Sequence, residues 1–555
     1  MFGTIGPPFD LWRLLVEERL GIVTGGSFNS GLAVRLDPEV DTESLRIGDF
    51  VVVDGGRFMF FCLVSDIRLE TSDMGVQSDP PMGKSADFVR KAITGTLTYG
   101  VVEVKPSLAV EKPSGEFVDI TLKPQPARTI PMHFAVLKRA TQEYLDMVFG
   151  EDDGKGSLFY VGTPLTMPDQ KVPFDLEKLM ERSNGIFGQS GTGKSFTTLL
   201  VLSGIIKRRV GVSLVFDMHD EYAFGKESEE KKWIQGLKNL FPTRVQVWSI
   251  DEAAASRSGR SVDRTIKIGL NQLEPEDILL LAQELNLTGT TEANIGLLRD
   301  QFKENWLKEL LSMSPAELEE FAQNVGAHSG SLSALWRKLK DIQRRPYVVD
   351  EADFNQLDDL TELLDRGTHV ILHFGRHSST LDYLLVSNIV TRRVRSLYQK
   401  KVEKYEETRD KSYAPRPLMI VLEEAHKFLS PSVARQTTFG QIAREMRKYH
   451  VVLTVVDQRP SAIDKEVLSQ LGTRITGKLT DENDIDAVLT GVSGRQALRG
   501  MIESLDTKRQ IVIVGHAIPM PLALNTRPYD ETFWAEMRET PEDKPDVNPL
   551  EEIFS

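Results

Sequence analysis

The residue types best suited to chemistry in this chain lie between Gly188 and Ser195, which read Gly-Gln-Ser-Gly-Thr-Gly-Lys-Ser. Glycine adopts backbone conformations that other residues avoid, so Gly188, Gly191 and Gly193 let the loop turn tightly with its N–H groups pointing inward. In this spacing Lys194 places its charge on the β- and γ-phosphates of a nucleotide, and the Ser195 hydroxyl ligates Mg²⁺. The segment therefore predicts a phosphate-binding loop (P-loop) that takes ATP and Mg²⁺.

The neighbouring elements must position this loop. A short apolar stretch at residues 185–187 precedes it and an apolar run at residues 196–202 follows it. A strand followed by a helix is what the loop requires, because the N-terminal end of the helix adds its positive dipole to the phosphate site. The residues expected to bind the nucleotide are Gly188, Gln189, Ser190, Gly191, Thr192, Gly193, Lys194, Ser195 and Phe196.

Two carboxylates stand at the end of another apolar run. Residues 417–422 read Pro-Leu-Met-Ile-Val-Leu, and Glu423 and Glu424 follow directly. The carboxyl ends of parallel strands form the edge of an α/β sheet where ligands bind. We expect Glu423 to join the Mg²⁺ shell, mostly through water, and Glu424 to orient and polarise the attacking water.

Two further polar side chains are expected at the same edge. Gln458 comes soon after the apolar run 451–456, where it would contact the γ-phosphate or the attacking water. His426 lies in Glu-Glu-Ala-His, and it is not a zinc ligand because no second histidine lies at helical spacing. The sequence leaves open whether His426 is a switch element or a packed imidazole.

A basic helix is predicted at residues 442–448. One of its arginines, Arg444 or Arg447, could cross a subunit boundary and stabilise charge in a neighbouring transition state. Periodicity alone favours the other interpretation, an exposed helix face with solvated arginines. A solvated outer face is also expected for a second cluster, Arg392, Arg393 and Arg395.

The N-terminal part of the chain predicts a small β-barrel. Residues 1–155 contain short β-rich runs, one of them at 117–122, separated by clusters of glycine, proline and aspartate. Such runs at short spacing are typical of barrels rather than of parallel sheets. Residues 70–92 are expected to form a long loop.

The remainder predicts an α/β fold. Strands alternate with helices over residues 156–225 and 365–530, which indicates a parallel sheet. Residues 226–364 between them have mostly helical periodicity, including a capping box at Ser314-Pro-Ala-Glu, and are predicted to be a largely helical insertion. Residues 531–555 are expected to form a C-terminal tail.

Composition and charge narrow the classes of function. The 555 residues are 40% apolar and 27% charged, and no apolar run is long enough to cross a bilayer. The single cysteine excludes a disulfide framework. The net charge of −14 argues against a surface that binds nucleic acid indiscriminately, although it leaves room for a basic channel. Since the first residues lack the features of a signal peptide, we expect a cytoplasmic protein with no membrane partner.

Taken together, these segments resemble the HerA branch of the HerA/FtsK hexameric DNA translocases. The resemblance covers roughly residues 160–530 and rests on motifs that follow one another in the family's order. They are the P-loop, Asp-Met-His-Asp-Glu-Tyr at 217–222, Leu-Glu-Glu-Ala-His at 422–426, Ile-Ala-Arg-Glu-Met-Arg-Lys-Tyr at 442–449 and Gln-Arg-Pro at 458–460. The P-loop and the acidic strand are common to many ATPases. The second and last motifs are therefore the ones that distinguish this family from other ATPases.

This resemblance implies a RecA-like P-loop ATPase core with a helical insertion, preceded by a barrel like the HAS barrel. It also implies a homohexamer with ATP at each subunit interface, DNA through a central pore, and Arg444 or Arg447 acting in trans. The leading interpretation is an ATP-driven DNA translocase or helicase that works with a NurA-type nuclease in DNA end processing.

Two other functions remain open from the sequence. A HerA-type ATPase could instead scaffold or activate an antiphage defence complex, with a sirtuin-like NADase or a nuclease as the effector. A conjugative-transfer ATPase is less favoured, because such proteins often carry membrane anchors and this chain has no candidate span.

Three positions depart from the family pattern. Glu423 stands where the family mostly has aspartate, Asp220 where glycine is usual, and Asp457 where threonine or serine is usual. Glutamate keeps the carboxylate of Glu423 but lengthens its reach, and Asp220 adds a charge near the nucleotide edge. None of the three changes removes a catalytic group.

Overall fold

The computed structural model describes residues 18–539, apart from residues 84–85, 113–122, 228–230, 252, 254–261, 283, 288, 354, 378, 433, 435–436 and 493. The expected strand at 117–122 and most of the expected C-terminal tail lie outside these described residues. The chain divides into two compact units. The first comprises residues 1–174, 477–480 and 492–527, and the second comprises residues 175–476, 481–491 and 528–555.

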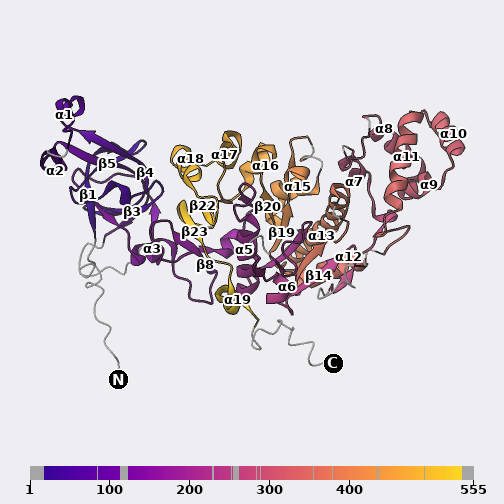
Figure 1. Ribbon diagram of the computed structural model, residues 1–555. Helices are drawn as coiled ribbons and strands as arrows, with labels where there is room; N and C mark the ends of the chain where they lie inside the picture. Colours follow the sequence, from indigo (N-terminus) through magenta and orange to yellow (C-terminus); the bar gives the residue numbers. More distant parts are fainter. Residues whose placement is uncertain are drawn as a thin grey trace, which may run out of the picture. The chain divides into compact units, whose positions relative to one another are not determined.

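The first unit contains a six-stranded antiparallel barrel (Figure 1). Its strands in chain order are β1 (Arg19–Ser27), β2 (Gly31–Leu36), β3 (Phe50–Asp54), β4 (Phe58–Thr71), β5 (Thr98–Glu111) and β7 (Val136–Arg139). They are arranged as β2-β1-β7-β3-β4-β5, and pairing of β2 with β5 closes the barrel. A short strand, β6 (Gln125–Pro126), pairs with β5. The predicted barrel is confirmed.

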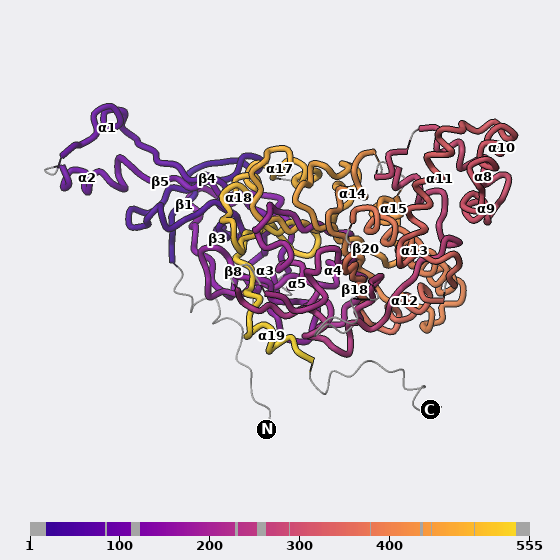
Figure 2. Tube along the Cα trace, turned by 45° about the vertical axis from the view of Figure 1, so that its right-hand side comes forward, coloured from indigo at the N-terminus to yellow at the C-terminus, as the bar shows by residue number. Residues whose placement is uncertain are grey.

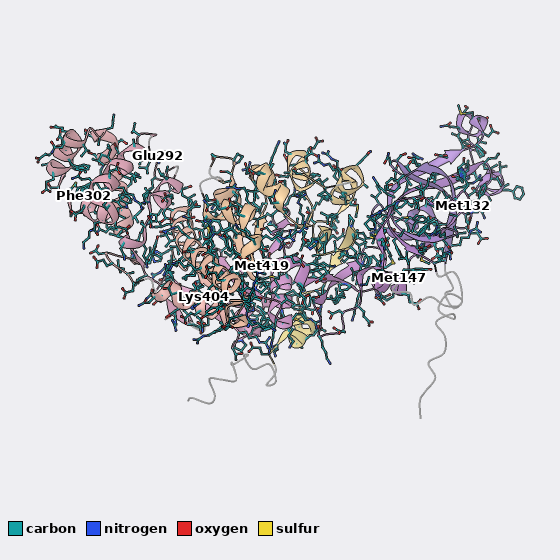
Figure 3. All side chains as sticks on the ribbon, turned by 180° about the vertical axis from the view of Figure 1, so that it is seen from behind. Met132, Met147, Glu292, Phe302, Lys404 and Met419 are labelled. Carbon is teal, nitrogen blue, oxygen red and sulfur yellow. The ribbon has the colours of Figure 1, made fainter. Side chains whose placement is uncertain are left out.

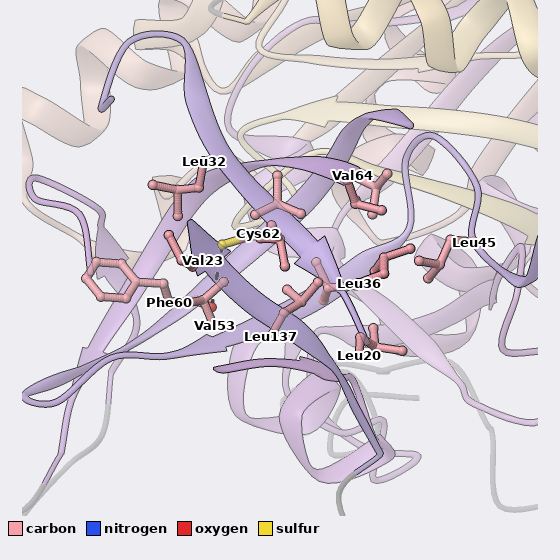
Figure 4. Close-up of a cluster of buried hydrophobic side chains, with 14 of the residues drawn as sticks. Leu20, Val23, Leu32, Leu36, Leu45, Val53, Phe60, Cys62, Val64 and Leu137 are labelled. Carbon is pink, nitrogen blue, oxygen red and sulfur yellow. Dashed lines mark hydrogen bonds between the residues drawn. The ribbon is translucent and has the colours of Figure 1, made fainter. Parts of the chain in front are cut away.

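The barrel interior is filled by one apolar cluster (Figure 4). Alternate residues of each strand point inward, as the period of two in a β-strand requires. Phe60 and Cys62 of β4 and Leu137 of β7 are among these buried side chains. Such burial on every strand stabilises the barrel through the hydrophobic effect.

The loop expected at residues 70–92 is wrong in part. Two short helices form there, α1 (Met74–Ser78) and α2 (Asp87–Ile93). The Asp73 carboxylate accepts from the Gly75 N–H at 2.8 Å and so caps α1. This capping carboxylate is a helix-start signal that outweighs the proline and glycine residues nearby.

The same unit also contains elements outside the barrel, some of them from the later part of the chain. The strands β8 (Leu158–Pro164), β22 (Gln510–Gly515) and β23 (Leu522–Thr526) pair antiparallel in the order β22-β23-β8. Two further helices of this unit are α3 (Gln142–Phe149) and α18 (Arg495–Ser504).

The second unit is built on a parallel sheet. Its strands are β10 (Asn184–Phe187), β11 (Val212–Asp217), β14 (Val245–Ser249), β15 (Arg264–Thr265), β18 (His369–His373), β19 (Leu418–Glu423), β20 (Val451–Asp457) and β21 (Thr473–Thr476). Their order is β15-β14-β18-β11-β19-β20-β10-β21. The central strands are buried along their whole length, which is why they read as continuous apolar runs. Met419, labelled in Figure 3, lies inside this sheet on β19.

Helices connect successive strands of this sheet, and α5 (Lys194–Arg208), α12 (Asn355–Asp365), α13 (Thr380–Thr408) and α15 (Thr438–Glu445) belong to this set. Two buried or half-buried arginines satisfy carbonyls where helices end. Arg244 Nη1 donates to Ile206 O at 3.1 Å, and Arg416 Nε donates to Asp365 O at 3.2 Å. Cations at helix C-termini also offset the negative end of the helix dipole.

Residues 226–364 contain the predicted helices. They are α7 (Pro275–Leu280), α8 (Thr291–Phe302), α9 (Trp306–Ser312), α10 (Pro315–Val325) and α11 (Ser329–Gln343). Figures 1 and 2 show α8 to α11 gathered together. The predicted capping box is present, since Ser314 N donates to Glu317 Oε2 at 2.8 Å and Glu317 N donates to Ser314 Oγ at 3.4 Å.

The same segment also supplies a strand that the sequence did not reveal. β14 is only five residues long, and its polar Gln246 interrupts the apolar pattern. It pairs parallel with β18 over its whole length. A short strand with a polar residue carries too little local signal, so its place is decided by the neighbouring strand.

The expectation that Arg392, Arg393 and Arg395 form a solvated outer face is wrong. Arg392 Nη2 lies 2.7 Å from Asp277 Oδ2, and Arg393 makes two bonds to Asp358 at 2.8 and 2.9 Å. Arg395 contacts Gln441. The arginines of α13 therefore bind α7, α12 and α15. Within the described ranges, no helix has the length and apolar character needed to span a membrane.

Candidate nucleotide-binding and catalytic site

The loop between β10 and α5 has the backbone shape that its glycines allow. The φ angle is +78° at Gly191 and +93° at Gly193, in the region that favours glycine. The Thr192 hydroxyl donates to Gln189 O at 2.8 Å, which closes the loop. Because α5 begins at Lys194, its first free N–H groups lie at the loop and can bind phosphate oxygens.

Lys194 lies over the loop among carboxylates. Its Nζ donates to Gln189 O at 2.8 Å, a bond that a bound phosphate could replace. Burial lowers the pKa of Lys194, while the negative charges of Glu221 and Glu424 act in the opposite direction. A cation in this surrounding suits the polyphosphate of a nucleotide.

The strand order brings the other expected residues to the same edge. β20 lies between the P-loop strand β10 and the acidic strand β19, with Phe187 paired to Asp457 and Glu423 paired to Val456. Gln458 therefore lies between the P-loop and the acidic pair. All these residues follow or end parallel strands, as the sheet-edge rule predicts.

Glu423 is buried, with only 6% of its surface exposed. Its Oε1 accepts from Tyr222 Oη at 2.5 Å, and its backbone carbonyl accepts from Tyr383 Oη at 3.0 Å. Burial raises the pKa of Glu423 well above its usual range, and the nearby charges of Glu221 and Asp217 raise it further. A cation bound here would reverse that effect.

The donor set at this position fits Mg²⁺. Glu423 Oε2 is buried and has no hydrogen-bond partner among the described residues, which is costly unless a cation or water meets it. Oxygen ligands of this kind, together with the Ser195 hydroxyl, suit a hard cation. No group of three or more His, Cys, Asp or Glu side chains in the described part of the chain could hold a metal. Mg²⁺ would therefore take most of its ligands from water and phosphate, as it does in nucleotide sites.

Glu424 and Gln458 contact each other. Gln458 Nε2 lies 3.3 Å from Glu424 Oε1. Glu424 has a φ angle of +48°, which is strained for a residue with a Cβ atom. The structure thus brings the expected base and the expected sensor together at the edge of the sheet.

Glu221 is a site residue that the sequence analysis did not assign. Its carboxylate accepts a hydrogen bond from the Ser195 hydroxyl, and its Oε1 lies 3.6 Å from Lys226 Nζ. Glu221 belongs to the motif at residues 217–222. That motif indicated the family resemblance, but it did not assign a role to each of its residues. Glu221 therefore lies beside the expected Mg²⁺ ligand.

The turn that carries Glu221 is held by Asp217. The Asp217 carboxylate accepts from the N–H groups of Glu221, Tyr222 and Ala223 at 2.7, 3.0 and 3.0 Å. Burial raises the pKa of Asp217, and these hydrogen bonds oppose that rise. Asp220 in the same turn has a φ angle of +56°, a conformation that glycine favours and aspartate tolerates. This explains how aspartate can stand at a position where glycine is usual.

His426 packs against Asp457, which favours the packed imidazole of the two interpretations left open. His426 Nδ1 lies 3.0 Å from Asp457 Oδ2 and 3.7 Å from Glu424 Oε2. The hydrogen bond to Asp457 raises the pKa of His426. Burial opposes ionisation of Asp457. The hydrogen bonds from His426 and the charge of its imidazole nevertheless hold the pKa of Asp457 below the usual value.

Three expected residues remain apart from this cluster. Phe196 is 43% exposed, and its ring centroid lies 6.3 Å from that of Tyr529. Arg447 is exposed, whereas Arg444 Nη1 is buried without a hydrogen-bond partner in the described residues. Within those residues no hydrogen bond or ion pair joins either arginine to Lys194, Glu423 or Glu424.

Comparisons with known proteins agree with this geometry. A family model described as "Helicase HerA, central domain" matches residues 159–394, and one described as "HAS barrel domain" matches residues 20–103. The DNA double-strand break repair helicase HerA of Pyrococcus furiosus is 25% identical over 408 residues, which are 69% of this chain and 71% of that protein. The protein of the same name from Sulfurisphaera tokodaii is 27% identical over 410 residues, or 70% and 72%.

Solved structures of conjugation proteins are also similar to the chain. VirB4 of Thermoanaerobacter pseudethanolicus has a TM-score of 0.43 and 16% identity, over 70% of this chain and 99% of that chain. The bacterial conjugative coupling protein TrwB has a TM-score of 0.45 and 13% identity, over 73% and 94%.

The two matched families follow each other as barrel and core, in agreement with the closed barrel and the P-loop sheet described above. The P-loop, the acidic strand and the strand between them lie at one edge of the sheet, which is the arrangement expected of a nucleotide site in an ATPase. The chain is therefore a P-loop ATPase whose central part matches the HerA helicase family model and whose N-terminal part matches the HAS-barrel model.

Proposed function

We propose that this protein is an ATP-driven, ring-forming DNA translocase or helicase that acts with a partner nuclease in DNA end processing. The observation that carries the proposal is the contact between Glu424 and Gln458 at the sheet edge that also holds Lys194. The relatives, which are named DNA double-strand break repair helicases, supply the substrate class.

The residues at this edge have distinct roles in the proposed reaction. The P-loop N–H groups and Lys194 bind the phosphates of ATP. Mg²⁺, held by Ser195 and through water by Glu423, would neutralise charge on the β- and γ-phosphates. Glu424 accepts a hydrogen bond from the attacking water and orients it toward the γ-phosphorus, and Gln458 holds that water or the γ-phosphate from the neighbouring strand.

Assembly into a ring of six is part of the proposal. Arg447 is exposed, and Arg444 Nη1 is buried without a hydrogen-bond partner in the described residues. In the proposed ring, one of these arginines stabilises the transition state at the nucleotide of a neighbouring subunit. A ring with a nucleotide at each interface would provide this contact, and DNA would pass through its centre.

The first experiment measures ATP hydrolysis by the purified protein with and without linear duplex DNA, and records the molecular mass in solution. We expect a hexamer-sized species whose turnover rises severalfold with DNA. Lys194→Ala should abolish turnover with and without DNA while the assembly persists, because it removes one phosphate contact from a cradle built of backbone. Hydrolysis that is indifferent to DNA would contradict the motor and favour a scaffold in a defence complex.

The nuclease partner is tested separately. A nuclease that binds the protein should degrade linear duplex DNA faster when ATP and the wild-type protein are both present. The Lys194→Ala protein is the matched control, because it should bind the nuclease without driving DNA toward it. Equal degradation with the two proteins would contradict coupled end processing.

A further inference from the structure

Glu424 and Gln458 can act on one water molecule only if two separate turns are held together. Glu424 lies in the turn after β19, and Gln458 lies in the turn after β20. Their single contact is 3.3 Å long, which is near the limit of a hydrogen bond. Strand pairing ends before both residues, so another contact must fix the two turns.

The turn after β19 also needs external support. Glu424 has a φ angle of +48°, and a left-handed residue with a Cβ atom costs roughly 1–2 kcal/mol. The Lys427 N–H donates to Glu424 O at 2.9 Å and begins a short helix, α14 (His426–Leu429). Such strain persists only where neighbouring groups determine the backbone.

Asp457 supplies that support from the end of β20. Its side chain is completely buried. Oδ2 accepts from the His426 N–H at 2.7 Å and from Nδ1 of the same residue at 3.0 Å, while Oδ1 accepts from the Arg459 N–H at 2.8 Å. The Asp457 carboxylate therefore binds both turns. In the first turn it binds His426, two residues after Glu424, and in the second it binds Arg459, one residue after Gln458.

The imidazole of His426 also lies next to the expected base. Its Nδ1 is 3.0 Å from Asp457 Oδ2 and 3.7 Å from Glu424 Oε2. A nitrogen that donates to Asp457 attracts the second carboxylate electrostatically as well. The raised pKa of His426 and the lowered pKa of Asp457 agree with a charged pair.

We propose, on the basis of the catalytic role given above to Glu424, that His426 and Asp457 form a positioning pair. The pair holds the turns after β19 and β20 at a fixed distance, and thereby aims Glu424 and Gln458 at the same water. Neither member touches the nucleotide in this arrangement. Their contribution is to the geometry of the chemical step and not to ATP affinity.

Two substitutions of similar polarity test the pair. The amide nitrogen of asparagine can take the place of Nδ1 in histidine, whereas glutamine places its amide one bond further along the side chain. His426→Asn should therefore keep the bond to Asp457 and most of kcat, and His426→Gln should lose it. A misplacement of about 1 Å costs on the order of 100-fold in rate. We expect kcat to fall by about that factor in His426→Gln, with KM for ATP within about threefold of wild type.

A double-variant comparison checks that the two residues act together. His426→Gln/Asp457→Ala should be no slower than the slower single variant, because both changes remove the same contact. If the fold-decreases in kcat of the two single variants multiply in the double variant, the proposed positioning pair is overturned. Equal kcat in His426→Asn and His426→Gln, or a rise in KM that accounts for the whole loss, would also overturn it.

The Glu424→Gln variant, measured in the same series, separates this proposal from the one on which it depends. If Glu424→Gln hydrolyses ATP at the wild-type rate, the catalytic assignment fails and the positioning role fails with it. If Glu424→Gln is inactive while every His426 variant keeps wild-type kcat, only the positioning role is overturned.

Discussion

At the scale of single residues, the proposed mechanism gives the two adjacent carboxylates of the acidic pair different tasks. Glu423 is buried and bound by Tyr222, whereas Glu424 is partly exposed beside Gln458. A buried carboxylate with an unpartnered oxygen suits a cation, and a partly exposed carboxylate can be reached by a water molecule. The different surroundings of these two identical side chains are the reason for the different roles proposed for them.

A substitution at Glu424 tests this division. Glu424→Gln keeps the size of the side chain but removes the charge that polarises water, so ATP should bind while turnover falls by about 100-fold or more. Binding of a fluorescent ATP analogue and steady-state hydrolysis measure the two effects. Near-normal turnover would remove Glu424 from the catalytic step.

At the scale of elements, the buried His369 connects neighbouring strands. His369 begins β18, and its Nδ1 accepts from the Ser213 N–H of β11 at 3.0 Å. Burial, with the charges of Arg244 and Arg416, lowers the pKa of His369 to about 3. The imidazole is therefore neutral in the folded protein until the pH approaches 3.

This histidine predicts how stability depends on pH. In the unfolded chain its pKa is near 6.5, so below that pH the unfolded state binds a proton that the folded state excludes. The free energy of unfolding should fall by about 1.4 kcal/mol for each pH unit below 6.5, until the folded-state pKa is reached. His369→Asn keeps an acceptor for Ser213 but does not titrate.

Urea unfolding of both proteins at pH 7.5 and pH 5 measures the effect. We expect the stability advantage of the wild-type protein over His369→Asn to shrink by about 2 kcal/mol between the two values. An advantage that stays constant would show that this imidazole does not remain neutral in the sheet.

At the scale of the whole molecule, the proposed ring makes each site depend on two chains. Lys194 and Glu424 belong to one subunit, and the proposal places Arg447 or Arg444 in the site of a neighbour. Removal of an arginine that acts in this way lowers turnover by about 10³-fold or more. The exposed Arg447 is the first position to change, because its replacement leaves the buried surroundings of Arg444 intact.

Mixing two inactive proteins tests this arrangement. Lys194→Ala has an intact arginine, and Arg447→Ala has an intact P-loop, so a mixed ring contains some complete interfaces. Equal mixing should restore about a quarter of wild-type turnover, the fraction of complete interfaces in a randomly mixed ring. A mixture of Lys194→Ala with Glu424→Gln is the matched control, because no interface in it is complete. Absence of recovery with both Arg447→Ala and Arg444→Ala would contradict an arginine in trans.

The sequence by itself determined the barrel, the parallel sheet and the P-loop, because each depends on local patterns. Apolar runs located β19 and β20 within one residue of their observed ends, and the glycine spacing located the loop. The sequence did not reveal β14, because the five residues of this strand carry little local signal.

Only the tertiary structure decided which side chains meet at the sheet edge. Tyr222 reaches Glu423, Ser195 reaches Glu221, and His426 reaches Asp457. These pairs come from different loops and strand ends, and the order and register of the strands bring them together. Order and register depend on long-range packing of buried surfaces, which is why no local pattern in the sequence contains them.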